Sequence, residues 1–258
     1  MSTRREFQQS SQLTAFSLAP NPGPMSLDGT NSYVISAPRS AQCVVVDPGP
    51  ADEDHLKGLA SAGEVELILI THRHADHTAG ALRLHELTGA PVRAGDRTHC
   101  YAAEPLQGGE EIRAAGVEIR VLATPGHTAD SLCFYLPEDG ANGSVLTGDT
   151  ILGKGTTVLD FPDGTLSDYL RSLDVLEALG AATVLPAHGP VLFAVDVVAR
   201  EYRNHRHQRL DQVRDALAVL GEQAPSEAVA RKVYHDVDPS VWRAALLSVE
   251  AQLAYLRG

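Results

Sequence analysis

The sequence lacks any long run of apolar residues. No stretch approaches the roughly 18 consecutive apolar residues that a membrane-spanning helix needs. Residues 1–12 are polar and carry Arg4, Arg5 and Glu6, so they also lack the apolar core of a signal peptide. We therefore expect a cytoplasmic protein without a membrane partner.

Positive charge is also in short supply. The chain has 21 Lys and Arg residues against 33 Asp and Glu residues, which gives a formal net charge of −12. A negatively charged protein does not attract the phosphates of nucleic acid through its overall charge. The composition therefore disfavours a DNA partner, and any anionic substrate has to be bound by local cations.

Cysteine is equally scarce. Cys43, Cys100 and Cys133 are far apart and form neither a CxxC pair nor a disulfide framework, which is typical of a reducing compartment. We expect all three to be structural thiols. With 258 residues, 43% of them hydrophobic, the chain is long enough to bury a core without disulfide bonds.

Strand-like and helical segments alternate through the middle of the chain. Short β-like runs are predicted at 33–35, 43–46, 67–70, 91–94, 110–113, 117–123, 131–136, 144–146 and 183–185, with helices at 52–62, 78–87 and 166–179. Thr78 is expected to cap the second of these helices. This alternation of strands and helices predicts two facing sheets with helices outside.

The last part of the chain is expected to be helical throughout. Helices are predicted at 195–220, 226–235 and 239–256, and Trp242 is expected to be buried there. We therefore divide the chain into a mobile tail at 1–15, a mixed domain at 16–194 and a helical domain at 195–258. The last two helices have the order of a helix-turn-helix, but packing against the mixed domain or a homodimer partner is favoured over DNA binding.

A dense cluster of metal-ligating side chains follows one predicted strand. His72, His74, Asp76 and His77 lie within six residues, and such imidazole and carboxylate groups suit Zn²⁺ and other divalent transition metals. His127, Asp149 and His188 each follow another predicted strand, beside Gly or Pro. The pattern therefore predicts that these side chains meet at one rim of the sheets and hold two neighbouring ions.

The order of these residues resembles that of the metallo-β-lactamase superfamily. The resemblance covers residues 16–194 and implies an α+β fold, a four-layer αβ/βα sandwich. It implies two divalent ions, with zinc as the first choice and manganese or iron also compatible. One ion would be held by His72, His74 and His127 and the other by Asp76, His77 and His188, with Asp149 bridging both.

A finer resemblance involves the segments 148–157 and 186–191 together with the helical tail. These are similar to the β-lactamase-like protein 2 subgroup, in which a C-terminal winged-helix-like domain follows the sandwich and members have been linked to cleavage of single-stranded RNA. The subgroup often has Glu where Lys154 stands, and the sequence ends at Gly258, where a wing hairpin would be expected.

The predicted function is a dinuclear metal-dependent hydrolase. Two ions about 3.5–4 Å apart share a water, lower its pKa and deliver a bridging hydroxide to the substrate. The expected substrate is a small molecule or a single-stranded RNA phosphodiester. Two alternatives stay open: an acyl-thioester hydrolase resembling glyoxalase II, which uses the same ligand order, and a mono-iron persulfide dioxygenase on the same fold.

Further residues are assigned roles around the predicted metals. Asp76 is expected to be catalytic as well, accepting the proton that the water gives up. Asp47 resembles a superfamily position that supports the ligands, and we expect it to hydrogen-bond one of the histidines. Cations and hydroxyls on the neighbouring loops are candidates for binding a phosphate or carboxylate of the substrate; these are Arg73, Lys154, Thr156 and Thr157.

Overall fold

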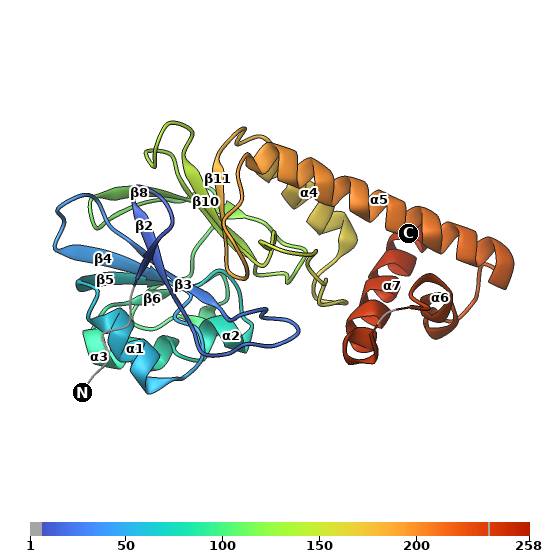
Figure 1. Cartoon of the computed structure of the whole chain (residues 1–258), viewed down its shortest axis with the longest axis horizontal. Helices are drawn as coiled ribbons and strands as arrows, with labels where there is room; N and C mark the ends of the chain where they lie inside the picture. The colour runs from blue at the N-terminus through green and yellow to red at the C-terminus, as the bar shows by residue number, and fades with distance from the viewer. Residues whose placement is uncertain (1–6, 237) are drawn as a thin grey trace.

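The computed structural model describes residues 7–236 and 238–258 and shows two sheets packed face to face, with helices outside (Figure 1). The first sheet has the order β1-β2-β3-β4-β5-β6 and the second the order β11-β10-β9-β8-β7. This is the α+β sandwich expected from the sequence. The strands of the first sheet are β1 (Gln8–Gln9), β2 (Thr14–Leu18), β3 (Asn31–Ile35), β4 (Gln42–Val46), β5 (Glu64–Leu69) and β6 (Val92–Arg93). Those of the second are β7 (Glu111–Ala114), β8 (Val117–Ala123), β9 (Leu132–Leu136), β10 (Ser144–Gly148) and β11 (Thr183–Pro186).

Both faces of each sheet are buried because the strands carry apolar residues at successive positions. In β4, Val44 and Val46 belong to the core between the sheets, whereas Val45 faces the outer layer, as the two-residue period of a strand requires. In β9, Phe134 points inward and Cys133 outward. The continuous apolar runs thus specify a sheet that is covered on both sides.

Helices cover the two outer faces. The first sheet is covered by α1 (Glu53–Ala60) and α3 (Ala81–Thr88), and the second by α4 (Leu166–Glu177) and the start of α5 (Val195–Leu220). Asp52 and Thr165 accept backbone N–H hydrogen bonds as the N-caps of α1 and α4. The four layers therefore leave one sheet edge free for the strand-end loops.

The C-terminal segment is helical, as predicted. Helix α5 runs along α4 and continues beyond the sandwich, where α6 (Ser226–Val233) and α7 (Trp242–Arg257) pack against it (Figure 1). Helix α7 also contacts α4. Between 195 and 258 the described residues form no strand, so the helices are confirmed and the winged-helix form stays a prediction.

One prediction about this segment is wrong. Trp242 is only partly buried, because it lies at the start of α7 with the Arg231 guanidinium over its ring, 5.4 Å from the centroid. The segment's own small core forms instead around Val213, Val229 and Val249.

The N-terminal segment departs from the predicted mobile tail at 1–15. Residues 1–6 lie outside the described residues, but β1 pairs with β2, which begins at Thr14. The Leu13 N–H also donates to Asp139, in the turn between β9 and β10 of the second sheet, at 3.0 Å. Part of this order depends on Asp139, 126 residues away, which local periodicity does not reveal.

The helix predicted at 78–87 begins later and follows a separate turn. Thr78 ends the short helix α2 (Ala75–Thr78), and its hydroxyl donates to the His74 carbonyl at 3.1 Å. Gly80 is the N-cap of α3, so the prediction that Thr78 caps it is wrong. Within the described part of the chain, no helix has both the length and the apolar character to cross a membrane.

Candidate metal centre

The candidate site lies where several strands end at one edge of the sandwich. His72 follows β5, His127 follows β8, Asp149 follows β10 and His188 follows β11. Gly148 lets two of these loops meet: its φ is +50°, and a Cβ there would lie 2.7 Å from the Thr71 Cβ. An L side chain at this position would therefore push Asp149 away from the loop that follows β5.

Three histidines form the first group of donor atoms. His72 Nε2 and His127 Nε2 each lie 3.0 Å from His74 Nδ1. No acid separates these three nitrogens, which is unusual unless they share a cation or a proton. Their donor atoms are close enough to hold one metal ion.

The second group combines one carboxylate with two histidines. Asp76 Oδ2 lies 3.2 Å from His188 Nε2 and 3.6 Å from His77 Nε2. Both Asp76 and His77 come from the short helix α2. These three donors also lie close enough to hold a metal ion.

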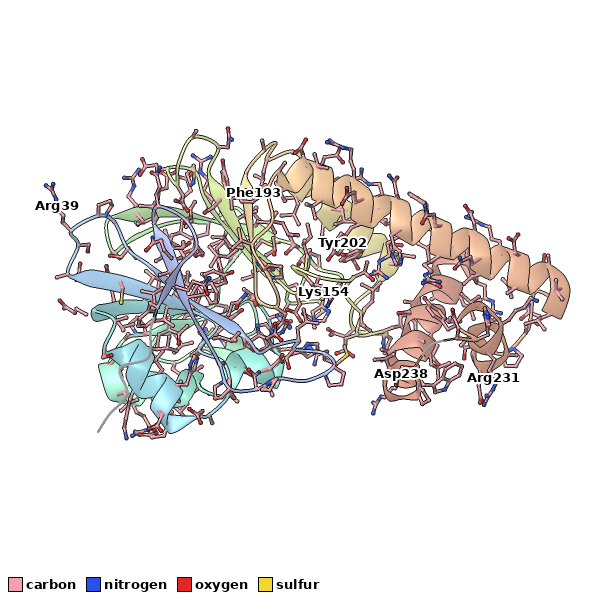
Figure 2. All side chains as sticks on the ribbon, viewed as in Figure 1. Arg39, Lys154, Phe193, Tyr202, Arg231 and Asp238 are labelled. Carbon is pink, nitrogen blue, oxygen red and sulfur yellow. The ribbon has the colours of Figure 1, made fainter. Side chains whose placement is uncertain are left out.

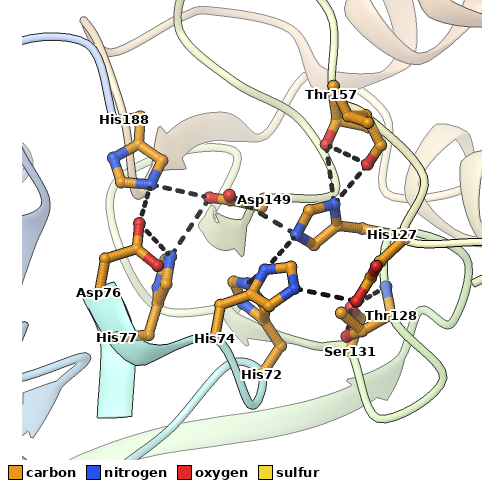
Figure 3. Close-up of polar contacts among 12 residues, drawn as sticks. His72, His74, Asp76, His77, His127, Thr128, Ser131, Asp149, Thr157 and His188 are labelled. Carbon is orange, nitrogen blue, oxygen red and sulfur yellow. Dashed lines mark hydrogen bonds and ion pairs between the residues drawn. The ribbon is translucent and has the colours of Figure 1, made fainter. Parts of the chain in front are cut away.

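Asp149 lies between the two groups. Its Oδ2 is 3.7 Å from His127 Nε2, and its Oδ1 is 3.4 Å from His188 Nε2. Figure 3 shows His72, His74 and His127 on one side of Asp149 and Asp76, His77 and His188 on the other. A carboxylate with one oxygen toward each group has the geometry of a bridging ligand.

Three of these buried donor atoms have no hydrogen-bond partner in the described structure: His77 Nε2, His188 Nε2 and Asp149 Oδ1. Buried polar atoms are rarely left unpaired, because desolvation costs about 1–3 kcal/mol each. A divalent cation would satisfy all three at once. The donor set and its unpaired atoms therefore fit the metal site that the sequence predicted.

Asp47 supports the second group from behind. Its Oδ2 lies 2.8 Å from His77 Nδ1, while its Oδ1 accepts the Thr71 N–H at 2.8 Å. If His77 Nδ1 donates its proton to Asp47, Nε2 keeps its lone pair and faces Asp149. Asp47 thus lies where the sequence analysis expected a residue that supports the ligands.

Other histidines are held by groups that the sequence did not indicate. His127 Nδ1 lies 2.6 Å from the Val158 carbonyl, and His188 Nδ1 lies 3.1 Å from the Gly29 carbonyl. His74 Nε2 lies 3.2 Å from Asp160 Oδ2. Each contact leaves the other ring nitrogen directed at the candidate site.

The electrostatic environment favours the neutral form of two histidines in the first group, His72 and His127. Burial and the neighbouring histidines lower the pKa of His72 well below its ordinary value. Burial also acts to lower the pKa of His77, but Asp47, Asp149 and Asp76 outweigh it and raise that pKa to about 10. The carboxylates therefore concentrate negative charge around the second group, as a cation site requires.

The four predicted substrate residues differ in placement. Arg73 forms ion pairs with Asp160 and Asp163, while Lys154 is exposed at the rim of a cleft that Thr156 also lines. Thr157 is buried, and its hydroxyl lies 3.2 Å from His127 Nδ1. Thr157 therefore supports a candidate ligand, and its hydroxyl is not free to meet a substrate.

A cleft of about 310 Å³ leads from the candidate metal centre to the C-terminal helices. His127 and Asp149 form its inner end. Apolar side chains cover much of its walls, among them Met25, Leu27, Leu152 and Val241. Figure 2 shows Lys154 in the space between the sandwich and the C-terminal helices.

Comparisons with known proteins agree with this architecture. Residues 25–188 match the family model of the metallo-beta-lactamase superfamily. The chain is 34% identical over 254 residues to the beta-lactamase-like protein 2 homolog of Caenorhabditis elegans, covering 93% of this chain and 82% of that protein.

A second relative carries a more specific name. The atrochrysone carboxyl ACP thioesterase of Aspergillus chevalieri is 35% identical over 211 residues, which cover 78% of this chain and 64% of that protein. Among solved structures, a metallo-beta-lactamase family protein from Thermus thermophilus has a TM-score of 0.77 and 24% identity, covering 95% of this chain and 93% of that chain. The latter likeness shows the fold.

Proposed function

Because the chain belongs to the metallo-beta-lactamase superfamily, we propose that it is a hydrolase that works with two divalent metal ions. The observation that carries this proposal is the convergence of seven donor side chains from four strand-end loops, three of whose buried atoms have no hydrogen-bond partner in the described structure. Zinc suits this set of nitrogen and oxygen donors, and manganese or iron is also compatible.

The residues of the chain have distinct parts in the proposed reaction. Bound divalent ions supply a water of lowered pKa and polarise the scissile bond. Asp149 would bridge the two sites, since its oxygens face different groups. Asp76 is one-third exposed and faces His188, so it is placed to accept a proton from the water and pass it to the leaving group.

An acyl thioester is the substrate class that we favour. The cleft is lined by apolar side chains close to His127 and Asp149, which suits an acyl chain beside the scissile group. The relative named as an ACP thioesterase supports the same class. The reaction would release a carboxylic acid and a thiol.

Single-stranded RNA is the second candidate. His205, Arg206 and Arg209 line the same cleft and are able to contact phosphates. Against this candidate, the net charge of −12 repels a long polyanion, and among the described residues that line the cleft Tyr234 is the single aromatic side chain besides the histidines. We therefore place RNA after the thioester.

The test is turnover by the zinc-loaded protein of an acyl-pantetheine thioester and of a labelled single-stranded RNA. We expect release of free thiol from the first at a rate at least ten times that of the Asp149→Ala variant. RNA cleavage with intact thioester would contradict our choice of substrate. Oxygen consumption with a persulfide and one iron per chain would favour the dioxygenase alternative.

A further inference from the structure

One wall of the cleft carries two arginines and a histidine that have no acidic partner among the described residues. His205, Arg206 and Arg209 all come from α5 and line the cleft. Earlier on the same helix, Arg200 pairs with Asp196 and Glu177, and Arg203 pairs with Asp174 and Glu177. Within the described structure, the helix therefore has neutralised arginines outside the cleft and unneutralised ones inside it.

Arg206 is the most unusual of these residues because its side chain is buried. The residue is only 4% exposed, and its Nε has no hydrogen-bond partner in the described structure. One terminal nitrogen donates to the Thr157 carbonyl, and the guanidinium lies 4.8 Å from the centre of the Tyr169 ring. A buried guanidinium without a carboxylate is costly unless a ligand supplies the missing negative charge.

Arg209 and His205 lie on the same wall as Arg206. The Arg209 guanidinium lies over the Tyr234 ring at 4.8 Å and donates a hydrogen bond to the Gln212 side chain at 2.8 Å. His205 Nδ1 is buried and unpartnered within the described part of the chain. Burial lowers the pKa of His205 and the two adjacent guanidinium groups lower it further, so His205 offers a neutral imidazole beside the two arginines.

We propose that Arg206, Arg209 and His205 form a subsite that binds a phosphate group of the substrate. A guanidinium presents several N–H donors in a planar fork that matches phosphate oxygens, and two guanidinium groups beside an imidazole suit a dianion. The Arg206 fork keeps an unpaired donor for this role. The assignment rests on the proposed function, because it treats the cleft as the place where the substrate lies.

The subsite also indicates which kind of thioester fits. His127 and Asp149 lie at the inner end of the cleft, whereas the wall with Arg206 and Arg209 belongs to α5. A substrate that spans both has its scissile carbonyl at the metal centre and a phosphate on its thiol portion. Phosphopantetheine thioesters have this chemistry, with the thioester and the phosphate at opposite ends of one flexible arm.

The loop that carries Lys154 is attached to α5 beside the subsite. The Tyr202 hydroxyl accepts the Leu152 N–H at 3.0 Å and lies 3.0 Å from the Gly155 carbonyl. This contact ties the loop that carries Lys154 to α5. Lys154 is thereby held at the cleft rim as an additional cation (Figure 2).

The test compares the affinity of the zinc-loaded protein for pantetheine and for 4′-phosphopantetheine, measured by isothermal titration calorimetry. The two ligands differ only in the phosphate, and we expect at least a tenfold tighter Kd for the phosphorylated one. Arg209→Gln should bring the ratio of the two Kd values, pantetheine over 4′-phosphopantetheine, close to one. Arg200→Gln, which removes the same charge from the same helix outside the cleft, should preserve it.

Two results would overturn the subsite: equal affinities for both ligands in the unmodified protein, or an equal loss in both variants. Arg206→Lys keeps the charge but removes the fork, and it should reduce the ratio if the variant retains its metal content and circular dichroism spectrum. The subsite and the proposed function fail separately. If binding depends on the phosphate but no thioester is hydrolysed, the proposed thioesterase activity is wrong. If thioester is hydrolysed but binding does not depend on the phosphate, the proposed subsite is wrong.

The same experiment tests whether the phosphate bound at the subsite belongs to a nucleotide instead of to phosphopantetheine. A short RNA with a 5′-phosphate and its unphosphorylated form are titrated in parallel. If the phosphate ratio appears for RNA and is absent for pantetheine, the phosphopantetheine assignment is wrong.

Discussion

At the residue scale, the candidate centre depends on contacts behind the ligands as much as on the ligands themselves. Asp47 follows β4 with a left-handed backbone, φ 51°, and its carboxylate meets both His77 and Thr71. Asp tolerates this conformation better than most residues. The strain is consistent with a position where side-chain direction matters more than local stability.

The first prediction concerns Asp47→Asn. The amide is a weaker acceptor for His77 Nδ1–H and no longer raises the electron density of that ring, so we expect zinc affinity to fall about 10–100-fold. Competition with a fluorescent chelator measures this. Asp139→Asn is the matched control, because Asp139 is also buried and hydrogen-bonded but accepts from Leu13 and Ser144, away from the site. An equal loss of zinc affinity in both variants would contradict the assigned role.

Sequence reasoning identified the candidate ligands but only part of their support. Imidazole and carboxylate groups at strand ends are visible in a sequence, and the superfamily resemblance pointed to Asp47. The contacts of the Val158 and Gly29 carbonyls with the histidines are not visible in the sequence, because every residue has a backbone carbonyl. Asp160 belongs to a set of 33 acidic residues and lies 86 positions from His74, so only the fold reveals their contact.

At the element scale, short continuous apolar runs predicted most strands, because strands covered on both sides leave a strong local signal. The short strands β1 and β2 were missed because they are held by pairing and by Asp139. Helices with an amphipathic pattern, such as α4, were predicted to within two residues.

The second prediction tests the packing of α4 beneath α5. Leu173 is fully buried in the outer core of the second sheet, whereas Val175 on the same helix is 40% exposed. Leu173→Ala should lower the free energy of unfolding by about 2–5 kcal/mol through lost burial and a cavity. Val175→Ala should change it by less than about 0.5 kcal/mol. Urea unfolding compares the two, and similar values would contradict the assigned layer.

The third prediction concerns an ion pair that joins the two sheets. Arg93 in β6 donates through both terminal nitrogens to Glu110, just before β7, at 2.6 and 3.0 Å. The pairing lowers the pKa of Glu110. A lowered folded-state pKa stabilises the protein above the unfolded value of about 4.3, and the contribution is lost as the pH falls through the folded value.

Glu110→Gln should therefore reduce the free energy of unfolding by about 1 kcal/mol at pH 7, and the difference from the unmodified protein should shrink as the pH falls below about 4. Glu111→Gln is the control, since Glu111 is 63% exposed and lies 3.4 Å from Arg120. Chemical unfolding at several pH values measures both. A difference for Glu110→Gln that grows toward acid pH would have the wrong sign.

At the scale of the whole molecule, the cleft lies between the sandwich and the C-terminal helices, whose packing against each other the sequence favoured without indicating which surfaces meet. The helices at the end of the chain were foreseen, but the contacts of α7 with α4 and α5 that close the cleft are tertiary. Arginines three residues apart in the sequence indicate a series that winds around α5. The structure shows in addition that they separate into sets with and without acidic partners among the described residues.

The fourth prediction concerns metal removal. Ions that bind only the folded chain stabilise it by mass action, about 4 kcal/mol per site at a free metal concentration of 1,000 times Kd. Removing the metal with a chelator should therefore lower the Tm by several degrees, and added zinc should restore it. Differential scanning calorimetry measures the shift. A Tm that does not respond to chelator would contradict a buried two-ion centre.

The most direct measurement is the metal content of the purified, zinc-loaded protein, determined by elemental analysis against protein concentration. We expect two ions per chain. We expect one ion for His188→Ala, because His72, His74 and His127 remain to hold the first. A ratio of one or less in the unmodified protein, or two ions retained in the variant, would rule out the two-ion centre.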